Sequence, residues 1–463
     1  MYLLQEALFP FESFVKDMDR DDRIFMLLSS IEVESVVEAF PEKQLGRRPY
    51  PREAVFRALV LQKVLQSPSI EALVTCLKYS PQLLHWCGFD YLGGPPSPTV
   101  FHRFVGELKE RCGLQVVDEV AMSMMEHLAP FAPSHRMVIL DSTDIPAKEA
   151  PPKKKKDSDG NAGNPIDQGE TDKVSSLDST DIGTKEAPPA EKKASDTDDG
   201  DQGDQGEMGK ISPLGSAWGH RTASDEETEM FYGYKYHAAN VLTDLGVLPL
   251  AGIVAPANVS DQEVAPWLMK EACRRHEAIF GFRPAYYLED AGYDSTVLYN
   301  IALELKGQAI INLNKRGQKA PPEGFTEKGT PLCAAGHPMA YWGADRKQQT
   351  IKFRCPKAAG KEVDCQHQCN CSSSYGPVVR LRIADNPRLY SCPARESEKW
   401  RTIYNNRSSV ERWYSVLKEH LGLAHMTRRG IHKAFIDAMF SVIAFLAGTL
   451  AQVRMHHRLQ KAA

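Results

Sequence analysis

The sequence lacks the features of an exported or membrane-embedded protein. No uncharged apolar run reaches the roughly 18 residues that a membrane-spanning helix needs. The opening stretch, MYLLQEALFP, has neither the basic segment nor the cleavage site of a signal peptide. The ten cysteines do not form the framework of a secreted disulfide-rich domain. These absences predict a cytoplasmic protein with reduced thiols and no membrane partner.

A strong excess of charge of one sign is also missing, because the net charge is only −4. The charge is unevenly distributed, however. Residues 147–210 carry 10 lysines against 16 acids, whereas the segment from Arg401 onwards carries 10 lysines and arginines against 3 acids. The basic C-terminal segment suits a phosphate-facing surface, although basic C-termini are common and charge alone decides little.

The first 130 residues are predicted to be all-helical. Apolar residues recur at helical spacing in 49–66, 67–89 and 95–113, and prolines and serines separate these segments. Short helices joined by tight turns fit either a helix-turn-helix-like DNA reader or a dimerisation domain. The candidates for phosphate contacts are Arg47, Arg48, Arg52, Arg57, His102, Arg103 and Lys109.

The stretch 135–144, HRMVILDSTD, predicts a buried strand that carries Asp141 at its polar end. Its end recurs: LDSTDIPAKEAPP at 140–152 returns as LDSTDIGTKEAPP at 177–189. The second copy follows DKVSS, which cannot form a buried strand, so we place the functional acid at Asp141 and not at Asp178. Asp144 is the other candidate in the first copy. A strand-ending aspartate that merely caps a turn is the common alternative.

Residues 147–215 are rich in charge, glycine and proline and almost free of large apolar side chains. Such a segment cannot bury enough surface to offset the entropy of ordering, which predicts a disordered insertion.

Residues 216–314 predict a regular α/β pattern. Strands at 231–244 and 245–258 precede a helix at 260–281 capped by Ser260, and a short strand, a helix and another strand follow. With the strand before Asp141, this order matches a ribonuclease-H-like core. In that fold the first and fourth strands are neighbours, so Asp141 and Asp290 would meet at adjacent strand ends. Glu289 is the alternative to Asp290 and would point to the opposite face.

The stretch 404–421, YNNRSSVERWYSVLKEHL, predicts one helix. Tyr404, Arg407, Glu411 and Lys418 share one face of it, beside an apolar stripe. On spacing alone, an exposed face with charge pairs is the more common explanation of these residues.

This spacing resembles the Y-R-E-K motif of DDE transposases from bacterial insertion sequences. Further stretches resemble the same group: Asp-x-Gly-Tyr at 290–293, YGYKYH at 232–237, Ala217-Trp218, and the N-terminal GRRPYPREAVFRALVLQ…SPTVFHRF. The resemblance implies a helical DNA-binding domain at 1–130 and an RNase H-like core formed by 131–146, 216–314 and 396–463. It also implies a catalytic triad of Asp141, Asp290 and Glu411.

Three carboxylates suit this chemistry, because Mg²⁺ and Mn²⁺ prefer oxygen ligands and paired divalent ions catalyse phosphodiester cleavage. We therefore expect all three acids to bind metal, and Arg407, Lys418 and Tyr404 to contact DNA. The implied partners are double-stranded DNA, as terminal inverted repeats and target, and further copies of the chain. In a bacterial cytoplasm the protein would join the nucleoid when bound to DNA. A catalytically inactive DNA-binding regulator and a nuclease without strand transfer are the alternatives.

A second insertion, 315–395, holds six of the ten cysteines and two histidines. Thiolate and imidazole at this density suit tetrahedral Zn²⁺, but no CxxC pair is present and the Cys365–Cys371 spacing is unusual. A structural zinc ribbon and inert or redox-active thiols are both open interpretations. The candidate zinc ligands are Cys333, His337, Cys355, Cys365, Cys369 and Cys371.

Overall fold

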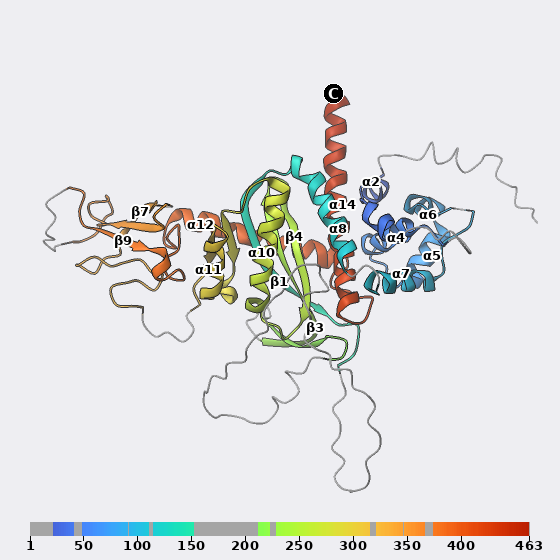
Figure 1. Ribbon diagram of the computed structural model, residues 1–463, viewed down its shortest axis with the longest axis horizontal. Coiled ribbons are helices and arrows are strands. Elements are labelled where there is room, and N and C mark those ends of the chain that lie inside the picture. The colour runs from blue at the N-terminus through green and yellow to red at the C-terminus, as the bar shows by residue number, and fades with distance from the viewer. Residues whose placement is uncertain are drawn as a thin grey trace, which may run out of the picture.

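The structure is a computed structural model that describes residues 22–40, 49–90, 92–110, 114–151, 212–222, 228–314, 321–345, 347–365 and 374–462. Three regions follow one another along the longest axis (Figure 1): the N-terminal helices, a central sheet with its helices, and a small sheet at the far end. Most of the charged insertion at 147–215 lies outside the described residues, so its predicted disorder stays a prediction.

Within the described residues, the regular elements of the N-terminal region are helices. Its helices are α2 (Arg23–Ser29), α3 (Glu34–Ala39), α4 (Arg52–Val64), α5 (Ile70–Tyr79), α6 (Pro81–Cys87), α7 (Pro98–Glu110) and α8 (Gln115–Leu128). Arg52, a candidate for phosphate contact, instead binds Glu107 at 2.8 Å and lies over the rings of Phe40 and Phe104. It therefore holds helices together. Arg47 and Arg48 lie outside the described residues.

The central sheet has six strands: β1 (Ser134–Pro146), β2 (Ala217–Thr222), β3 (Thr228–Thr243), β4 (Gly246–Pro256), β5 (Tyr286–Glu289) and β6 (Gln308–Ile311). Its main order is β4-β3-β1-β5-β6, and β2 pairs with the start of β3. β1 is antiparallel to β3 and parallel to β5. The strands that carry Asp141 and precede Asp290 are therefore neighbours, as the sequence predicted. β2 is an additional strand that the sequence pattern did not predict.

Helices cover both faces of this sheet. α10 (Asp261–Phe280) packs on β1, β3 and β4 and begins after Ser260, the predicted N-cap, which forms a capping box with Glu263. α11 (Thr296–Glu304) packs beside it, against β6. α13 (Ser408–Ser415) contacts β1 and β4, and α14 (Ile431–Ala462) contacts β3 and β4. The resulting core is a mixed α/β arrangement.

α14 is also the one helix, within the described part of the chain, with the length and apolarity of a membrane span. Residues 438–453 within it form a 16-residue stretch without a charged side chain, which approaches the length of a membrane span without reaching it. The structure gives the physical reason for this apolarity. α14 packs against α2, α4 and α8 on one side and the sheet on the other, and 83% of its most apolar window is buried.

The predicted helix at 404–421 is helical but not uniform. α12 (Glu398–Tyr404) ends at Tyr404, a 3₁₀ turn covers Asn405–Arg407, α13 follows, and a π turn covers Val416–His420. The tighter and wider turns change the angle per residue. The prediction of one regular helical face from Tyr404 to Lys418 was therefore wrong in its geometry.

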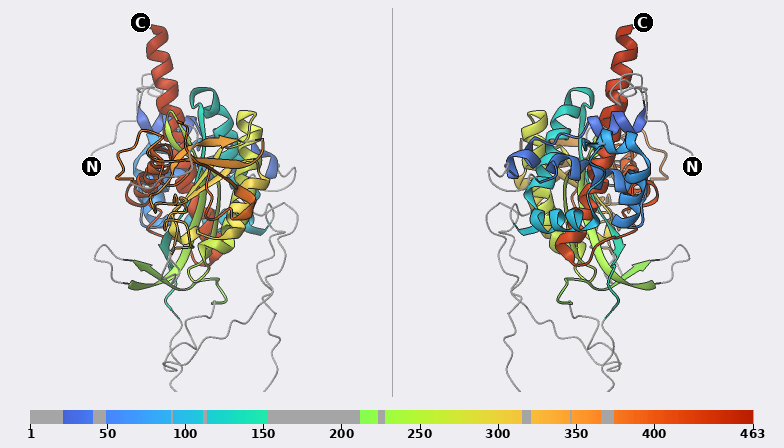
Figure 2. Two further views of the ribbon diagram at one scale, coloured as in Figure 1. Left: turned by 90° about the vertical axis from the view of Figure 1, so that its left-hand side faces the viewer. Right: turned by 90° about the vertical axis from the view of Figure 1, so that its right-hand side faces the viewer.

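The far end of the molecule is a separate small sheet. β7 (Ala340–Asp345), β8 (Thr350–Arg354) and β9 (Val378–Arg382) form an antiparallel sheet in that order. It has its own apolar cluster of Met339, Ile351, Phe353, Ile383 and Ala394. Figure 2 shows the molecule from its two ends: the orange strands of this sheet face the viewer on the left, and the blue N-terminal helices face the viewer on the right.

Candidate active site

Asp141 and Asp290 lie on the same face of the sheet, on neighbouring strands. Asp290 directly follows the end of β5, but Asp141 lies within β1, which continues to Pro146, so the prediction that this strand ends at Asp141 was wrong. Ile139 pairs with Leu288 in the parallel register of β1 and β5, and each aspartate follows its partner by two residues. Side chains two apart in a strand share a face. Asp290 leaves β5 and turns, with its Oδ1 accepting a hydrogen bond from the Gly292 amide at 2.8 Å. The topology thus brings together two acids that are far apart in the sequence.

Glu411 reaches the same region through Arg407. The Arg407 guanidinium donates to Glu411 Oε1 at 2.7 Å and lies 3.8 Å from Asp141 Oδ2. Burial lowers the pKa of Arg407, but Asp141, Tyr404, Glu411 and Asp290 outweigh it and raise the pKa above its usual value. Arg407 is therefore the cation that the three predicted acids share in this structure.

The surroundings of Asp141 perturb its ionisation. Burial raises the pKa of its carboxyl from 3.8 to about 7, with the nearby Asp290 and Asp261 adding to the rise. The Ser142 amide and Arg407 act in the opposite direction without cancelling it. A carboxylate placed in this way needs additional positive charge to stay ionised at neutral pH.

Tyr404 lies beside the same acids and is held from two sides. Its hydroxyl accepts a hydrogen bond from Asn312 Nδ2 at 2.8 Å, and its ring stacks on Trp400 at 4.7 Å and 12°. Burial raises its pKa, Arg407 lowers it, and Asp290 and Glu411 raise it further. Lys418 lies half-buried on the π turn, and among the described residues no contact places it against the acids.

A second layer of polar residues supports Asp141, and the sequence-based prediction missed it. Ser142 points to the other face, where its hydroxyl donates to Asp261 Oδ1 at 2.7 Å. The buried His237 lies 3.3 Å from the same oxygen. On the first face, the Tyr414 hydroxyl donates to the Asp141 carbonyl at 2.7 Å. In the sequence, Asp261 looks like an ordinary acid in the first turn of a helix. Its position beside Ser142 and His237 becomes apparent only from the structure, in which these two residues are paired on β1 and β3.

The two alternative acids point elsewhere. Asp144 is three residues beyond Asp141 on β1 and binds Arg221 of β2 at 3.3 Å. Glu289 lies on the opposite face from Asp290, as the alternation predicted, and is fully buried with no hydrogen-bond partner for either oxygen. Burial, with a smaller effect of Asp290, raises the pKa of Glu289 from 4.5 to about 8.

Glu289 should therefore cost stability at neutral pH. The pKa of Glu289 is higher in the folded than in the unfolded protein. The protein is therefore most stable with respect to this group below pH 4.5, where Glu289 is protonated in both states, and it loses stability as the pH rises towards 8. The loss approaches about 3 kcal/mol at pH 7, at about 1.4 kcal/mol per pH unit. We expect Glu289→Gln to be more stable than the parent at pH 7.5 and nearly equal at pH 4.5, measured by urea unfolding across this range. Glu304→Gln, an exposed glutamate of α11, is the control; a pH-independent difference for Glu289→Gln would contradict the prediction.

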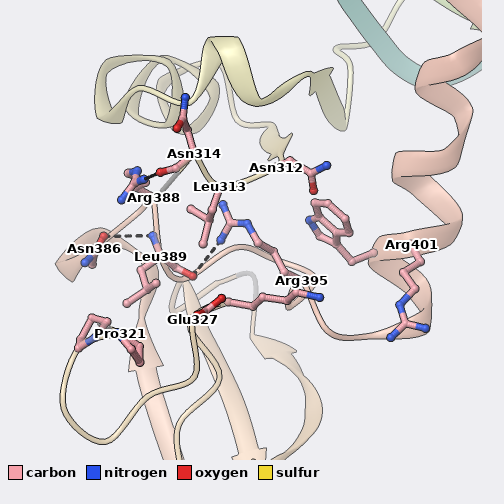
Figure 3. Close-up of a pocket in the computed structure, with 13 residues that line it drawn as sticks. Asn312, Leu313, Asn314, Pro321, Glu327, Asn386, Arg388, Leu389, Arg395 and Arg401 are labelled. Atoms are coloured by element: carbon pink, nitrogen blue, oxygen red, sulfur yellow. Dashed lines mark hydrogen bonds between the residues drawn. The ribbon is translucent and has the colours of Figure 1, made fainter. Parts of the chain in front are cut away.

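A cavity of about 270 Å³ lies next to Tyr404, between the core and the 315–395 insertion (Figure 3). Asn312, Trp400 and Arg401 line one side and Glu327, Asn386 and Leu389 the other. Two further lining arginines are engaged in structural contacts. Arg388 binds Asp294 at 2.7 Å, and Arg395 donates to the Tyr299 hydroxyl at 2.7 Å and to the Ile311 carbonyl at 3.2 Å. These arginines attach the insertion to the core.

The predicted zinc ligands are only partly described. Cys333 and His337 form a tight turn in which the Cys333 amide donates to the His337 carbonyl, and His337 Nε2 contacts the Asp364 carbonyl at 3.1 Å. Within the described ranges, no three histidine, cysteine or acidic side chains stand together as a metal site. Cys369 and Cys371 lie outside those ranges, so the zinc hypothesis stays a prediction.

The acids themselves fit a divalent cation by chemistry. Asp141, Asp290 and Glu411 offer only hard oxygen donors, and a bound cation would oppose the burial and the neighbouring acids that raise the pKa of Asp141. Within the described residues they do not form a grouped metal site, and Glu411 is bound to Arg407. What the geometry provides is a set of carboxylates on one face with a single guanidinium among them.

Comparison with protein families gives two matches. The model of the "Transposase DDE domain" matches residues 169–447, which is 279 of the 463 residues, and the model of a "Transposase domain (DUF772)" matches residues 9–107. The first match contains Asp290 and Glu411 but begins after Asp141, and it includes Asp178 of the second repeat copy. No curated protein matches the chain.

Proposed function

The chain belongs to the family of transposases with a DDE domain, and from this premise we propose that it cuts DNA at the ends of an insertion sequence and joins these ends to target DNA. The family implies a nucleotidyl-transfer enzyme that acts on DNA with divalent metal ions. The observation that carries the finer proposal is the convergence of Asp141, Asp290 and Glu411 on Arg407. The mixed α/β core is consistent with an RNase H-like fold.

In this proposal Asp141, Asp290 and Glu411 hold the metal ions. Divalent cations bound by such carboxylates supply an activated water or 3′-hydroxyl nucleophile and neutralise charge on the phosphate and on the leaving oxygen. Ser142, Asp261 and Tyr414 keep Asp141 in place from both faces of β1. These supports matter because the acids must be positioned before the substrate arrives.

Arg407 and Tyr404 are proposed to bind the DNA backbone beside the reacting phosphate. A guanidinium forms paired hydrogen bonds with phosphate oxygens, and Arg407 already lies among the acids. Tyr404 is fixed by Asn312 and Trp400, so its hydroxyl is presented without further ordering. Lys418 is assigned to a more distant phosphate on the basis of the motif alone. The helices of the N-terminal region are proposed to bind the terminal repeats.

The test is a joining assay with the full chain. We expect a labelled duplex, made from the DNA that flanks the gene of this protein, to be cut and joined to a plasmid when Mg²⁺ or Mn²⁺ is added. Ca²⁺ and EDTA serve as controls and should give no joined product. Cleavage without any new strand junction would replace the proposal by the nuclease alternative, and binding without cleavage would favour a regulator.

A further inference from the structure

The small sheet of the insertion has one apolar face and one cationic face. Ile351 and Phe353 of β8 point into the apolar cluster. Side chains alternate along a strand, so those of Thr350, Lys352 and Arg354 point to the other, outer face. Lys352 pairs with Arg380 of β9, and Thr350 pairs with Arg382. Side chains at paired positions share a face. Lys352, Arg380 and Arg382 therefore line the outer surface together.

Two aromatic rings are exposed on the same outer surface. Trp342 of β7 is 46% exposed and Tyr375, just before β9, is 37% exposed, and their ring centroids are 6.1 Å apart. The Arg354 guanidinium lies 4.4 Å from the Trp342 ring and 3.8 Å from the Tyr375 ring. Lys352 Nζ donates to the Tyr375 hydroxyl at 2.9 Å. The rings are thus held rigidly by cations while part of each stays in contact with solvent.

The surrounding charge has the sign that a polyanion requires. Residues 315–395 carry 14 lysines and arginines against 6 acids, a net charge of +8, in a chain whose total is −4. Cations interleaved with exposed aromatic rings suit a nucleic acid strand with accessible bases, because phosphates meet the cations and bases stack on the rings. An acidic peptide would satisfy the cations but leave the rings without a partner.

We propose that the outer face of the β7-β8-β9 sheet, with Trp342, Tyr375, Lys352 and Arg380, binds single-stranded DNA. This surface is separate from the carboxylates and lies at the end of the molecule opposite the N-terminal helices. Single-strand binding at this face is an activity beyond the proposed cleavage reaction. The cleavage reaction would only account for the presence of unpaired DNA near the protein. Binding at this face does not require that the acids cut DNA.

The test uses the full chain with Glu411→Gln, in EDTA, so that cleavage cannot interfere. The probe is a fluorescein-labelled 15-nucleotide thymidine strand, followed by fluorescence anisotropy across a range of salt concentrations. We expect Trp342→Ala to weaken binding roughly 5- to 100-fold, the effect of losing one stacked base, and Trp342→Phe to retain most of it. Arg380→Glu should weaken binding. It should also reduce the slope of log K against log salt concentration by at least about 0.7, the value for one phosphate contact on a single strand.

Two matched variants away from this face serve as controls. Lys270→Glu removes an exposed cation of α10, and Phe131→Ala removes an aromatic ring that is 43% exposed. Both should bind within twofold of the parent. The thermal midpoint of each variant is compared with that of the parent; if Trp342→Ala unfolds the small sheet, Arg380→Glu decides.

Three outcomes would overturn the proposal: binding by Trp342→Ala and Arg380→Glu within twofold of the parent, equal losses in the controls, or displacement of the strand by a poly-glutamate peptide at equal charge concentration. These outcomes are independent of the joining assay. A protein that binds the strand here but never cuts DNA would refute the proposed function and leave this inference intact.

Discussion

Asp141→Asn is expected to abolish metal-dependent cleavage, while Asp178→Asn leaves it unchanged. The loss should be on the order of 10³-fold or more, because a metal-binding carboxylate contributes several kcal/mol of transition-state stabilisation. The two aspartates occupy the same position in the two copies of LDSTDI. The family match covers only the second copy, whereas the geometry joins Asp141 to Asp290 and Arg407. Cleavage of a labelled duplex by the two variants decides between the copies.

Two controls make this comparison interpretable. Asp144→Asn changes an acid on the same strand that pairs with Arg221 and should retain cleavage. DNA binding by Asp141→Asn, measured without metal, should equal that of the parent and so exclude misfolding. Loss of activity in Asp178→Asn with activity kept in Asp141→Asn would assign the catalytic role to the second copy.

Asp437→Ala is expected to lower the free energy of unfolding by about 3–5 kcal/mol, because it leaves two buried cations without a counter-ion. Asp437 of α14 is fully buried and lies 3.0 Å from Lys63 Nζ of α4. It also binds Arg428 and accepts a hydrogen bond from the Thr427 amide at 3.1 Å. Burial acts to raise the pKa of Asp437, but Lys63 and Arg428 outweigh it, so the pKa lies below its usual value.

The network joins the N-terminal helices to the core, so its loss should also separate their unfolding. We expect the thermal midpoint of Asp437→Ala to fall and its transition to broaden or split in calorimetry. Asp385→Ala is the matched control, because its ion pair with Arg382 is exposed and such pairs contribute roughly 0–1 kcal/mol. Equal stability of the two variants would show that the buried network does not hold the regions together.

Much of the fold could be predicted because local patterns specify it. The periodicity of 49–110 predicts α4 to α7, and the alternation around Gly246 predicts the β3–β4 hairpin. Ser260 and Glu263 predict the start of α10. The prediction was less successful where tertiary packing overrides local preference, as at the 3₁₀ and π turns around α13, where helical spacing alone indicates one regular helix.

The sequence by itself limited the candidate acids to a few, because Asp141 or Asp144, Glu289 or Asp290, and Glu411 each follow or lie within a recognisable element. Only the tertiary structure decided how they are arranged, because the face of a strand depends on register with its neighbours. That register places Asp290 beside Asp141 and buries Glu289. It also brings Asp261 and His237 to Ser142, from α10 and β3. Such contacts between distant segments carry no local sequence signal, since each residue alone fits an ordinary cap or strand position.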